Sequence, residues 1–328
     1  MKKATLAAIS ALALVTPALS QNEPEKALSP ADIVNAAPQD DWSVIAPEDL
    51  MVMTLAPDAQ DEKRQVVIQL MPAPFSQGWV DNIRTLARAQ WYDGTSVNRV
   101  QDNYVVQWGD PNYDNPESGG KAKPLPDGLQ VMSEGAYTAT IPGWGMRRAA
   151  RSVAAPATVL SDSYAQAAEF FKGWPIAIDS APERAWPVHC YGMVGVGRNY
   201  SPDTGSGAEL YTVIGHAPRH LDRNIALAGR IISGMQHLSS LPRGTGALGF
   251  YAAEEADKRT PILSIRVASD LPEAERPQFE YLSTESESFA RYADARANRR
   301  DPFFIAPAGG ADVCNVPVPV RPFEYADE

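Results

Sequence analysis

The spacing of apolar residues near the start of the chain predicts a hairpin followed by a helix. Two apolar runs, Leu50–Ala56 and Gln65–Leu70, lie on either side of a charged segment, Asp58–Arg64. This pattern is typical of two antiparallel strands joined by a polar turn. From Trp79 to Ala89 the apolar residues recur every three or four positions, which predicts a helix with one buried face.

A second predicted hairpin carries polar side chains between its apolar ones. Val97–Val100 and Tyr104–Trp108 are rich in β-branched and aromatic residues, and each run follows a turn signal. Because side chains alternate along a strand, Arg99 and Gln107 each share a strand face with a valine. An arginine and an amide on a buried face need polar partners. From the pattern alone, this segment is either an edge hairpin with a solvated arginine or part of a polar site.

The later segments are less regular. Pro111–Tyr191 is long and rich in turn residues, and within it Tyr164–Lys172 predicts a short helix. Pro261–Ser269 predicts a further strand, and the apolar spacing in Glu285–Arg300 predicts a late helix. Strand-rich segments between one early and one late helix suit a mainly β fold, a closed antiparallel barrel capped by helices.

The first 20 residues are predicted to be a secretory signal peptide and not part of the fold. Two lysines precede an apolar run from Ala4 to Val15, and a small-x-small cleavage pattern ends at Ser20. This run is too short for a membrane span, and no later stretch approaches the ~20 apolar residues that a span needs. We therefore expect an exported protein, most simply a periplasmic one, in which the polar residues 21–47 form an extended leader.

Composition argues against several classes of partner. The formal net charge of −11 argues against nucleic acid or an anionic membrane surface. Two cysteines and four scattered histidines give no metal-ligand spacing, so we expect neither a metal nor another cofactor. A hydrophobic fraction of 44% is ordinary for a chain with a core, and 28 prolines favour strands and loops over long helices.

The two cysteines, Cys190 and Cys314, have two interpretations. An even pair in an oxidising compartment suggests a disulfide, which would tie the C-terminal tail to the centre of the chain. The alternative is two separate buried thiols.

The segment from Asn82 to Asp110 resembles the first signature of the cyclophilin-type prolyl isomerases. That family shows a helix, then Tyr-Asp-Gly-Thr, Phe-His-Arg and Gly-Phe-x-x-Gln-Gly-Gly-Asp. This chain has NIRTLARAQWYDGT, then Val97-Asn98-Arg99, then YVVQWGD from Tyr104. The arginine and the glutamine, Arg99 and Gln107, match at the family spacing, whereas the neighbouring histidine and phenylalanine do not.

A second stretch, Gly205–Asn224, resembles the other family signature, Gly-Ser-Gln-Phe-Phe-Ile followed by Trp-Leu-Asp-Gly. Its flanks, Gly192–Val196 and Ile225–Met235, are similar to the strands on either side of that signature. The residues that differ from the family pattern stand at positions of the family's substrate pocket. Glu209 replaces the glutamine, Leu210-Tyr211 replace Phe-Phe, His220 replaces the tryptophan, Ile225 replaces the histidine, and Gly197-Arg198 replace Ala-Asn.

The resemblance implies a cyclophilin-like domain over residues 48–240. An insertion of about 111–190 interrupts this domain, and residues 241–328 form a C-terminal extension packed on the barrel. It also implies a site in which Arg99 and Gln107 are catalytic and the substrate is bound by six further residues: Tyr104, Val105, Glu209, Tyr211, His220 and Leu221. We further expect Glu209 to lie near Arg99 and to pair with it.

Two functions follow from this resemblance. The first is an isomerase that acts on X-Pro bonds of exported proteins and assists their folding, with Arg99 stabilising the twisted prolyl amide. The second is a cyclophilin-fold peptide-binding module or chaperone with weak or no turnover. Retention of Arg99 and Gln107 favours the first, and the substitutions at His220 and Ile225 favour the second. Either function requires proline-containing polypeptides as partners.

Overall fold

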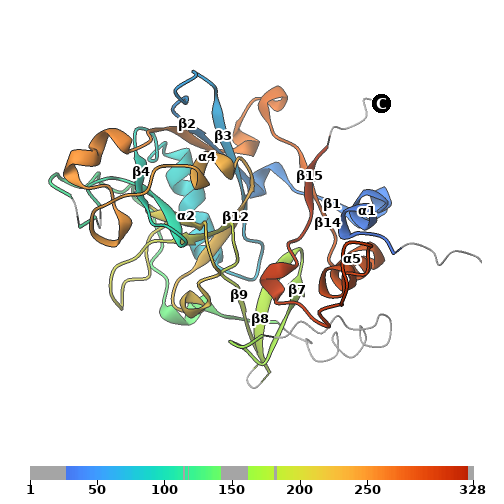
Figure 1. Ribbon diagram of the computed structural model, residues 1–328. Coiled ribbons are helices and arrows are strands. Elements are labelled where there is room, and N and C mark those ends of the chain that lie inside the picture. Colours follow the sequence, from blue (N-terminus) through green and yellow to red (C-terminus); the bar gives the residue numbers. More distant parts are fainter. Residues whose placement is uncertain (1–26, 114, 117, 142–161, 181–182, 324–328) are drawn as a thin grey trace, which may run out of the picture.

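A computed structural model describes residues 27–113, 115–116, 118–141, 162–180 and 183–323 (Figure 1). The predicted signal peptide, residues 1–20, lies outside these ranges. Among the described residues, no helix is both long enough and apolar enough to cross a membrane.

The centre of the molecule is an eight-stranded antiparallel sheet that curls into a nearly closed barrel, which confirms the predicted fold class. The sheet closes where Ser96 bridges Pro261, and the backbone N–H of Val97 donates to the carbonyl of Thr260 at 2.9 Å. In spatial order the strands are β13 (Ile262–Val267), β2 (Leu50–Leu55), β3 (Arg64–Leu70), β12 (Leu227–Ser233), β10 (Met193–Val196), β11 (Leu210–Val213), β5 (Val105–Gly109) and β4 (Ser96–Val100).

Helix α2 (Gln77–Arg88) packs on strands β12 and β13. Its predicted apolar stripe is buried and belongs to the same core as the barrel interior. The indole N–H of Trp79 is satisfied by the carbonyl of Thr204 at 3.0 Å, so this large side chain is buried without an unpaired polar group. A short helix, α4 (Gln236–Ser239), follows β12.

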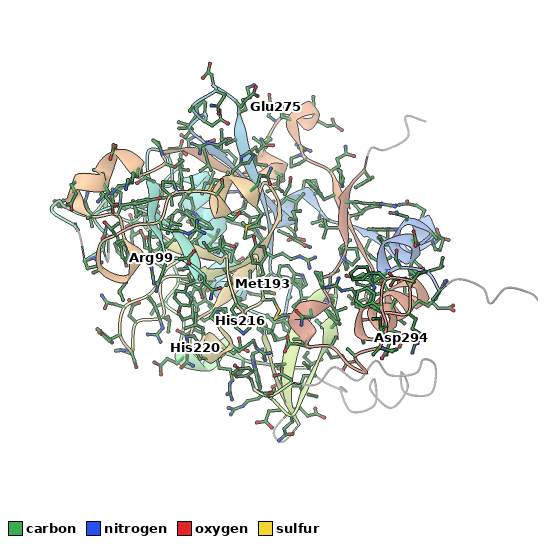
Figure 2. All side chains as sticks on the ribbon, viewed as in Figure 1. Arg99, Met193, His216, His220, Glu275 and Asp294 are labelled. Carbon is green, nitrogen blue, oxygen red and sulfur yellow. A yellow bond between two sulfur atoms is a disulfide. The ribbon has the colours of Figure 1, made fainter. Side chains whose placement is uncertain are left out.

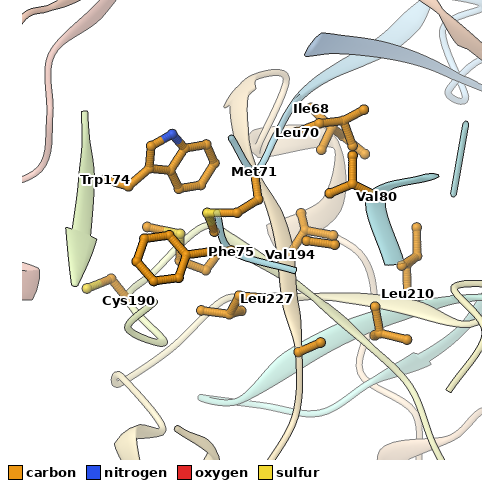
Figure 3. Packing of buried hydrophobic residues seen from close by; sticks show 14 of the residues in the cluster. Ile68, Leu70, Met71, Phe75, Val80, Trp174, Cys190, Val194, Leu210 and Leu227 are labelled. Carbon is orange, nitrogen blue, oxygen red and sulfur yellow. The ribbon is translucent and has the colours of Figure 1, made fainter. Parts of the chain in front are cut away.

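The insertion between β5 and β10 forms its own antiparallel sheet. Its strands, in spatial order, are β6 (Ala139–Thr140), β9 (Glu183–Pro187), β8 (Trp174–Ser180) and β7 (Ala167–Phe171). The insertion does not form a separate core, because Trp174 and Cys190 lie in one apolar cluster with barrel residues such as Leu70 and Val194 (Figure 3).

The helix predicted over Tyr164–Lys172 is wrong, because this segment contains strand β7. Lys172 and Gly173 both have positive φ angles, 48° and 82°, and they form the tight turn from β7 to β8. Such a two-residue turn matches the twist of paired strands. A side chain at position 173 would also start 2.5 Å from the ring of Tyr281, so the turn requires glycine there.

A third sheet joins the two ends of the described chain. Strand β14 (Phe279–Leu282) pairs with β1 (Trp42–Val44) on one side and with β15 (Val320–Pro322) on the other. Helix α5 (Glu287–Ala297) lies against α1 (Pro30–Asn35) (Figure 1).

The polar leader is less extended than predicted, because it contains α1 and β1. The signal for α1 is a capping box: the Ser29 hydroxyl accepts from the Asp32 backbone, and the Asp32 carboxylate accepts from the Ser29 backbone. Short 3₁₀ helices are also present: η1 (Gln39–Asp41), η2 (Pro47–Asp49), η3 (Glu134–Tyr137), η4 (Arg219–Leu221), η5 (Ala247–Gly249), η6 (Ala253–Lys258), η7 (Ala268–Asp270), η8 (Glu273–Glu275) and η9 (Val313–Asn315).

Residues 241–328 contribute more than an external extension. Strand β13, which lies in this region, pairs with β2 and helps to close the barrel. In the structure Cys190 and Cys314 form a disulfide across a sequence separation of 124 residues, which fastens the end of the insertion to the C-terminal tail.

We predict that alkylation of the native protein without reductant modifies neither cysteine. Replacing both Cys190 and Cys314 by alanine should lower the free energy of unfolding by about 2–5 kcal/mol, because the bond closes a long loop in the unfolded chain. Urea unfolding measures this loss, and wild-type protein treated with reductant is the matched control. Two alkylated thiols in the native protein would rule out the bond.

Candidate active site

The register of three barrel strands sets three polar side chains in one row. Arg99 of β4 pairs with Gln107 of β5, and Gln107 pairs with Tyr211 of β11. Directly paired residues point to the same face of a sheet, so all three side chains lie together. The Arg99 Nη1 group donates to Oε1 of Gln107 at 3.2 Å. The two catalytic candidates predicted from the sequence are therefore in direct contact.

This row lies in a groove with a volume of about 710 Å³. Six sequence-predicted residues line it: Arg99, Gln107, Tyr104, Val105, Tyr211 and Leu221. The other two, Glu209 and His220, are not among its lining residues. Arg99 and His220 are labelled in the same half of the molecule, away from Asp294 of helix α5 (Figure 2).

Arg99 is fixed by neutral partners. Its Nε group donates to the carbonyl of Leu248 at 2.7 Å, and Nη2 donates to the side-chain oxygen of Gln101. The guanidinium carbon lies 5.6 Å from the ring centre of Tyr104 and 5.5 Å from that of Phe250. Burial lowers the pKa of the guanidinium from its usual value. The aromatic faces stabilise the cation while leaving its charge uncompensated by a carboxylate.

Glu209 lies outside this row and not against the guanidinium. In the part of the chain that the structure describes, Arg99 forms no ion pair. The Glu209 carboxylate lies over Gly109, where an added Cβ would be 2.1 Å from its Oε1 atom. The side chain itself is buried, at 3% exposure. The pairing expected between Glu209 and Arg99 is thus replaced by the neutral contacts described above.

An apolar slot lies beside the polar row. Val105 and Tyr211 are buried there, and Tyr104, Leu221 and Ile225 pack against them. His220 is exposed and its ring stacks on Tyr104, with ring centres 6.4 Å apart and planes 10° apart. The slot walls are thus aromatic and aliphatic.

Sequence reasoning missed the groove residues that come from distant segments. Leu248 and Phe250 follow β12, and the backbone of Phe250 bridges that of Arg99. Asn112, Asn115 and Pro116 come from the start of the insertion. No local pattern marks these residues, because their place in the groove depends on contacts with strands far away in the sequence. Asn199 and Tyr200, which follow β10, were also missed, whereas the resemblance had placed Gly197 and Arg198 at pocket positions.

A buried histidine lies behind the slot. His189, the residue before Cys190, places Nδ1 at 2.8 Å from Oδ1 of Asp222 and Nε2 at 2.9 Å from the hydroxyl of Tyr211. Burial lowers the pKa of His189, and this effect outweighs the opposing hydrogen bond to Asp222. No sequence pattern placed His189 at the slot, so its contact with Tyr211 was not foreseen.

The comparisons with known proteins agree with this geometry. Residues 60–267 match the family model of the cyclophilin type peptidyl-prolyl cis-trans isomerases. The chain belongs to this family. The predicted resemblance is therefore confirmed, and so is the expectation of an enzyme of the peptidyl-prolyl cis-trans isomerase type. None of the curated proteins matches the sequence.

Among solved structures, the chain is similar to the cyclophilin AquaCyp293 from Hirschia baltica. The two share 20% sequence identity with a TM-score of 0.61, over 87% of this chain and 95% of that one. A cyclophilin type peptidyl-prolyl cis-trans isomerase from Cryptosporidium parvum, crystallised in the presence of the dipeptide Ala-Pro, matches with 10% identity and a TM-score of 0.35. That match covers 66% of this chain and 98% of the other. At 20% identity the likeness to AquaCyp293 concerns the fold alone.

The described part of this cyclophilin contains no group of three or more His, Cys, Asp or Glu side chains that could hold a metal ion. The site is instead built from a guanidinium, an amide and a tyrosine hydroxyl beside an apolar slot. Such groups bind and orient a substrate by hydrogen bonds and apolar contact.

The neutral state of His189 should make stability depend on pH. The pKa of His189 is lowered in the folded protein, whereas the pKa of a histidine in the unfolded chain is about 6.5. As the pH falls below about 6.5, the unfolded chain takes up a proton that the folded chain does not, so stability is lost. The groups facing this imidazole are Asp222, Arg219, His220 and Tyr211. Asp222 has a lowered pKa, so its own contribution is lost only in stronger acid.

We predict that the free energy of unfolding of the wild type falls between pH 7.5 and pH 5, by at most about 1.4 kcal/mol per pH unit from this one group. His189→Gln should flatten that slope, and His216→Gln, at an exposed position, should leave it unchanged. Urea unfolding at each pH gives the three slopes. Equal slopes for wild type and His189→Gln would show that His189 is not held neutral.

Proposed function

We propose that this cyclophilin isomerises X-Pro bonds in exported proteins, assists their folding, and uses Arg99 to stabilise the twisted prolyl amide. The observation that carries the proposal is the position of the Arg99 guanidinium. It is held by neutral partners at the edge of an apolar slot, in the row with Gln107 and Tyr211. Isomerase activity in general follows from the family.

The reaction needs no covalent step. Rotation about an X-Pro bond is slow because the amide loses its resonance, with a barrier of about 20 kcal/mol. A catalyst accelerates it by binding the twisted amide better than either planar form. A donor directed at the changed amide electronics and a slot for the proline ring are sufficient, so the proposed mechanism uses no cofactor.

Arg99 is suited to be that donor. A guanidinium has five N–H groups, and three of its hydrogen bonds go to Leu248, Gln107 and Gln101. Two N–H groups of Arg99 therefore remain for a substrate that enters the groove. Gln107 orients Arg99, since its side-chain oxygen accepts from Nη1. In this proposal Tyr104, Val105, Tyr211 and Leu221 enclose the proline ring, and His220 lies beside the slot through its contact with Tyr104. Glu209 is buried outside the groove and does not touch the peptide.

Export is supported by the N-terminal sequence and by cysteine usage. Residues 1–20 have the pattern of a signal peptide, and Cys190 pairs with Cys314, as is common in oxidising compartments. We infer a periplasmic location, where newly translocated proline-containing polypeptides would be the substrates.

A second candidate function is peptide binding with little or no turnover. It is favoured by the two departures at the rim and wall of the slot, where His220 and Ile225 replace the tryptophan and histidine of the family pattern. The groove would then hold proline-containing segments without accelerating their rotation.

We predict that Arg99→Ala lowers kcat/KM for an Ala-Ala-Pro-Phe peptide by roughly a hundredfold, because it removes the donor that the twisted amide needs. A protease-coupled assay measures the rate. Arg99→Lys keeps the charge but loses the planar group, so it should recover only part of the activity. Arg300→Ala, at an exposed position after helix α5, is the matched control and should behave as the wild type.

Equal turnover by wild type and Arg99→Ala would place catalysis elsewhere. A wild type that binds the same peptide in a calorimetric titration without accelerating its isomerisation would establish the second candidate function instead.

A further inference from the structure

The wall of the proline slot is connected to a buried hydrogen-bond network. Tyr211 is only 4% exposed, and its hydroxyl lies 2.9 Å from Nε2 of His189. The two rings lie nearly parallel, 12° apart, with their centres separated by 6.4 Å. His189 itself has 0% exposure, so it reaches the groove only through Tyr211. Tyr211, which forms a wall of the slot, is thus held on its buried side by His189.

The contacts of His189 define the direction of this hydrogen bond. Oδ1 of Asp222 accepts from the backbone N–H of His189 at 3.0 Å and lies 2.8 Å from its Nδ1. An ionised carboxylate can only accept, so Nδ1 carries the ring proton. In the neutral ring Nε2 is then bare and accepts, and the Tyr211 hydroxyl donates to it. The tyrosine therefore has one preferred hydroxyl orientation.

Asp222 is itself fixed by a second buried pair. Its Oδ2 atom accepts from Nε of Arg219 at 2.7 Å, and Nη2 of Arg219 donates to Asp162 at 2.6 Å. The side chains of Arg219 and Asp222 are 3% and 4% exposed. Burial alone raises the pKa of Asp222, but the hydrogen bonds and charges of His189 and Arg219 outweigh it, so the net pKa is lowered. The carboxylate therefore stays ionised and remains an acceptor for His189.

The network joins the barrel to the insertion. Tyr211 and Asp222 belong to the second signature of the barrel, whereas Asp162 and His189 belong to the insertion. Cys190, which follows His189, is bonded to Cys314 in the C-terminal tail. The insertion and the tail thus fasten the segment that carries the histidine.

We propose that His189, oriented by Asp222, is a positioning residue for the proline slot and acts through the hydroxyl of Tyr211. The proposal rests on the isomerase function above and adds a residue to it. Tyr211 lies over Gly195, where an added Cβ would come within 2.3 Å of its ring and hydroxyl. The ring therefore occupies a narrow gap, and its tilt sets the width of the slot. A preorganised wall lowers the ordering cost of binding the proline ring.

A double-mutant cycle tests this proposal. Tyr211→Phe removes the hydroxyl and keeps the ring, and His189→Asn keeps a donor for Asp222 but is too short to reach Tyr211. Each single variant should raise KM for the Ala-Ala-Pro-Phe peptide about tenfold, as expected for a buried donor or acceptor left unpaired. The value of kcat should change much less, because the slot binds ground and transition states alike. His189→Gln, whose side-chain oxygen can accept from Tyr211, should recover part of the affinity.

The decisive result is non-additivity. If His189 acts through the hydroxyl, His189→Asn should have little further effect on KM when Tyr211 is already phenylalanine. Additive losses, or wild-type KM values for both single variants, would overturn the proposal and leave the network with a purely structural role. Ile265→Val, in the buried face of β13, is the control for lost stability and should leave KM unchanged while lowering the melting temperature.

The same cycle is measured by calorimetric titration of the peptide, which separates this inference from the isomerase function. If the wild type binds the peptide without turnover, non-additive losses of affinity still support the role of His189. Additive or absent losses of affinity overturn it. A wild type that does not bind the peptide at all overturns both this inference and the proposed slot.

Discussion

The register between β4, β5 and β11 is the constraint on which the site depends. It aligns Arg99 with Gln107 and Gln107 with Tyr211, so one face of the sheet carries a cation, an amide and an aromatic wall in sequence. A shift of one residue in any of these pairings would turn a polar side chain toward the barrel core. Burial of the opposite faces of the same strands prevents such a shift, because Val97, Val106 and Trp108 fill that core. Stability and site geometry are therefore set by the same pairing.

The additions to the barrel are part of its functional structure. The loop after β12 brings the carbonyl of Leu248 and the ring of Phe250 to Arg99, and the end of the insertion brings His189 to Tyr211. Two distant segments thus hold the two sides of one groove. The contacts of Arg99 with Leu248 and Phe250 are neutral, so its positive charge stays available. Tyr211 is held by His189, and His189 is oriented by the ionised carboxylate of Asp222.

The sequence predicted the parts of this structure that depend on local patterns. Alternation along Tyr104–Trp108 placed Val105 and Gln107 on one face correctly, because strand periodicity acts over a few residues. The face predicted to be shared by Val97 and Arg99 was wrong, because a bulge between them turns Val97 into the core while Arg99 faces the groove. Prediction from the sequence failed where contacts between distant segments determine the local structure. Tyr164–Lys172 became a strand because a positive-φ turn pairs it with β8, and the contact of His189 with Tyr211 has no sequence signal at all. The predicted pairing of Arg99 with Glu209 was wrong for the same reason, since Leu248, which accepts from Arg99 instead, lies 149 positions away.

The three-stranded sheet β1-β14-β15 has a consequence for how the protein is made. Its strands bring Trp42 and Val44 beside Leu282 and Glu280, and bring Phe279 beside Pro322. While only the first half of the chain has been synthesised, β1 has no partner in this sheet, because β14 and β15 both lie in the second half. Contacts of such long sequence separation form slowly, because the entropy cost of closing a large loop comes before any stabilisation by the contacts. This sheet is therefore complete only when β15, the last strand of the described chain, has been added to β14.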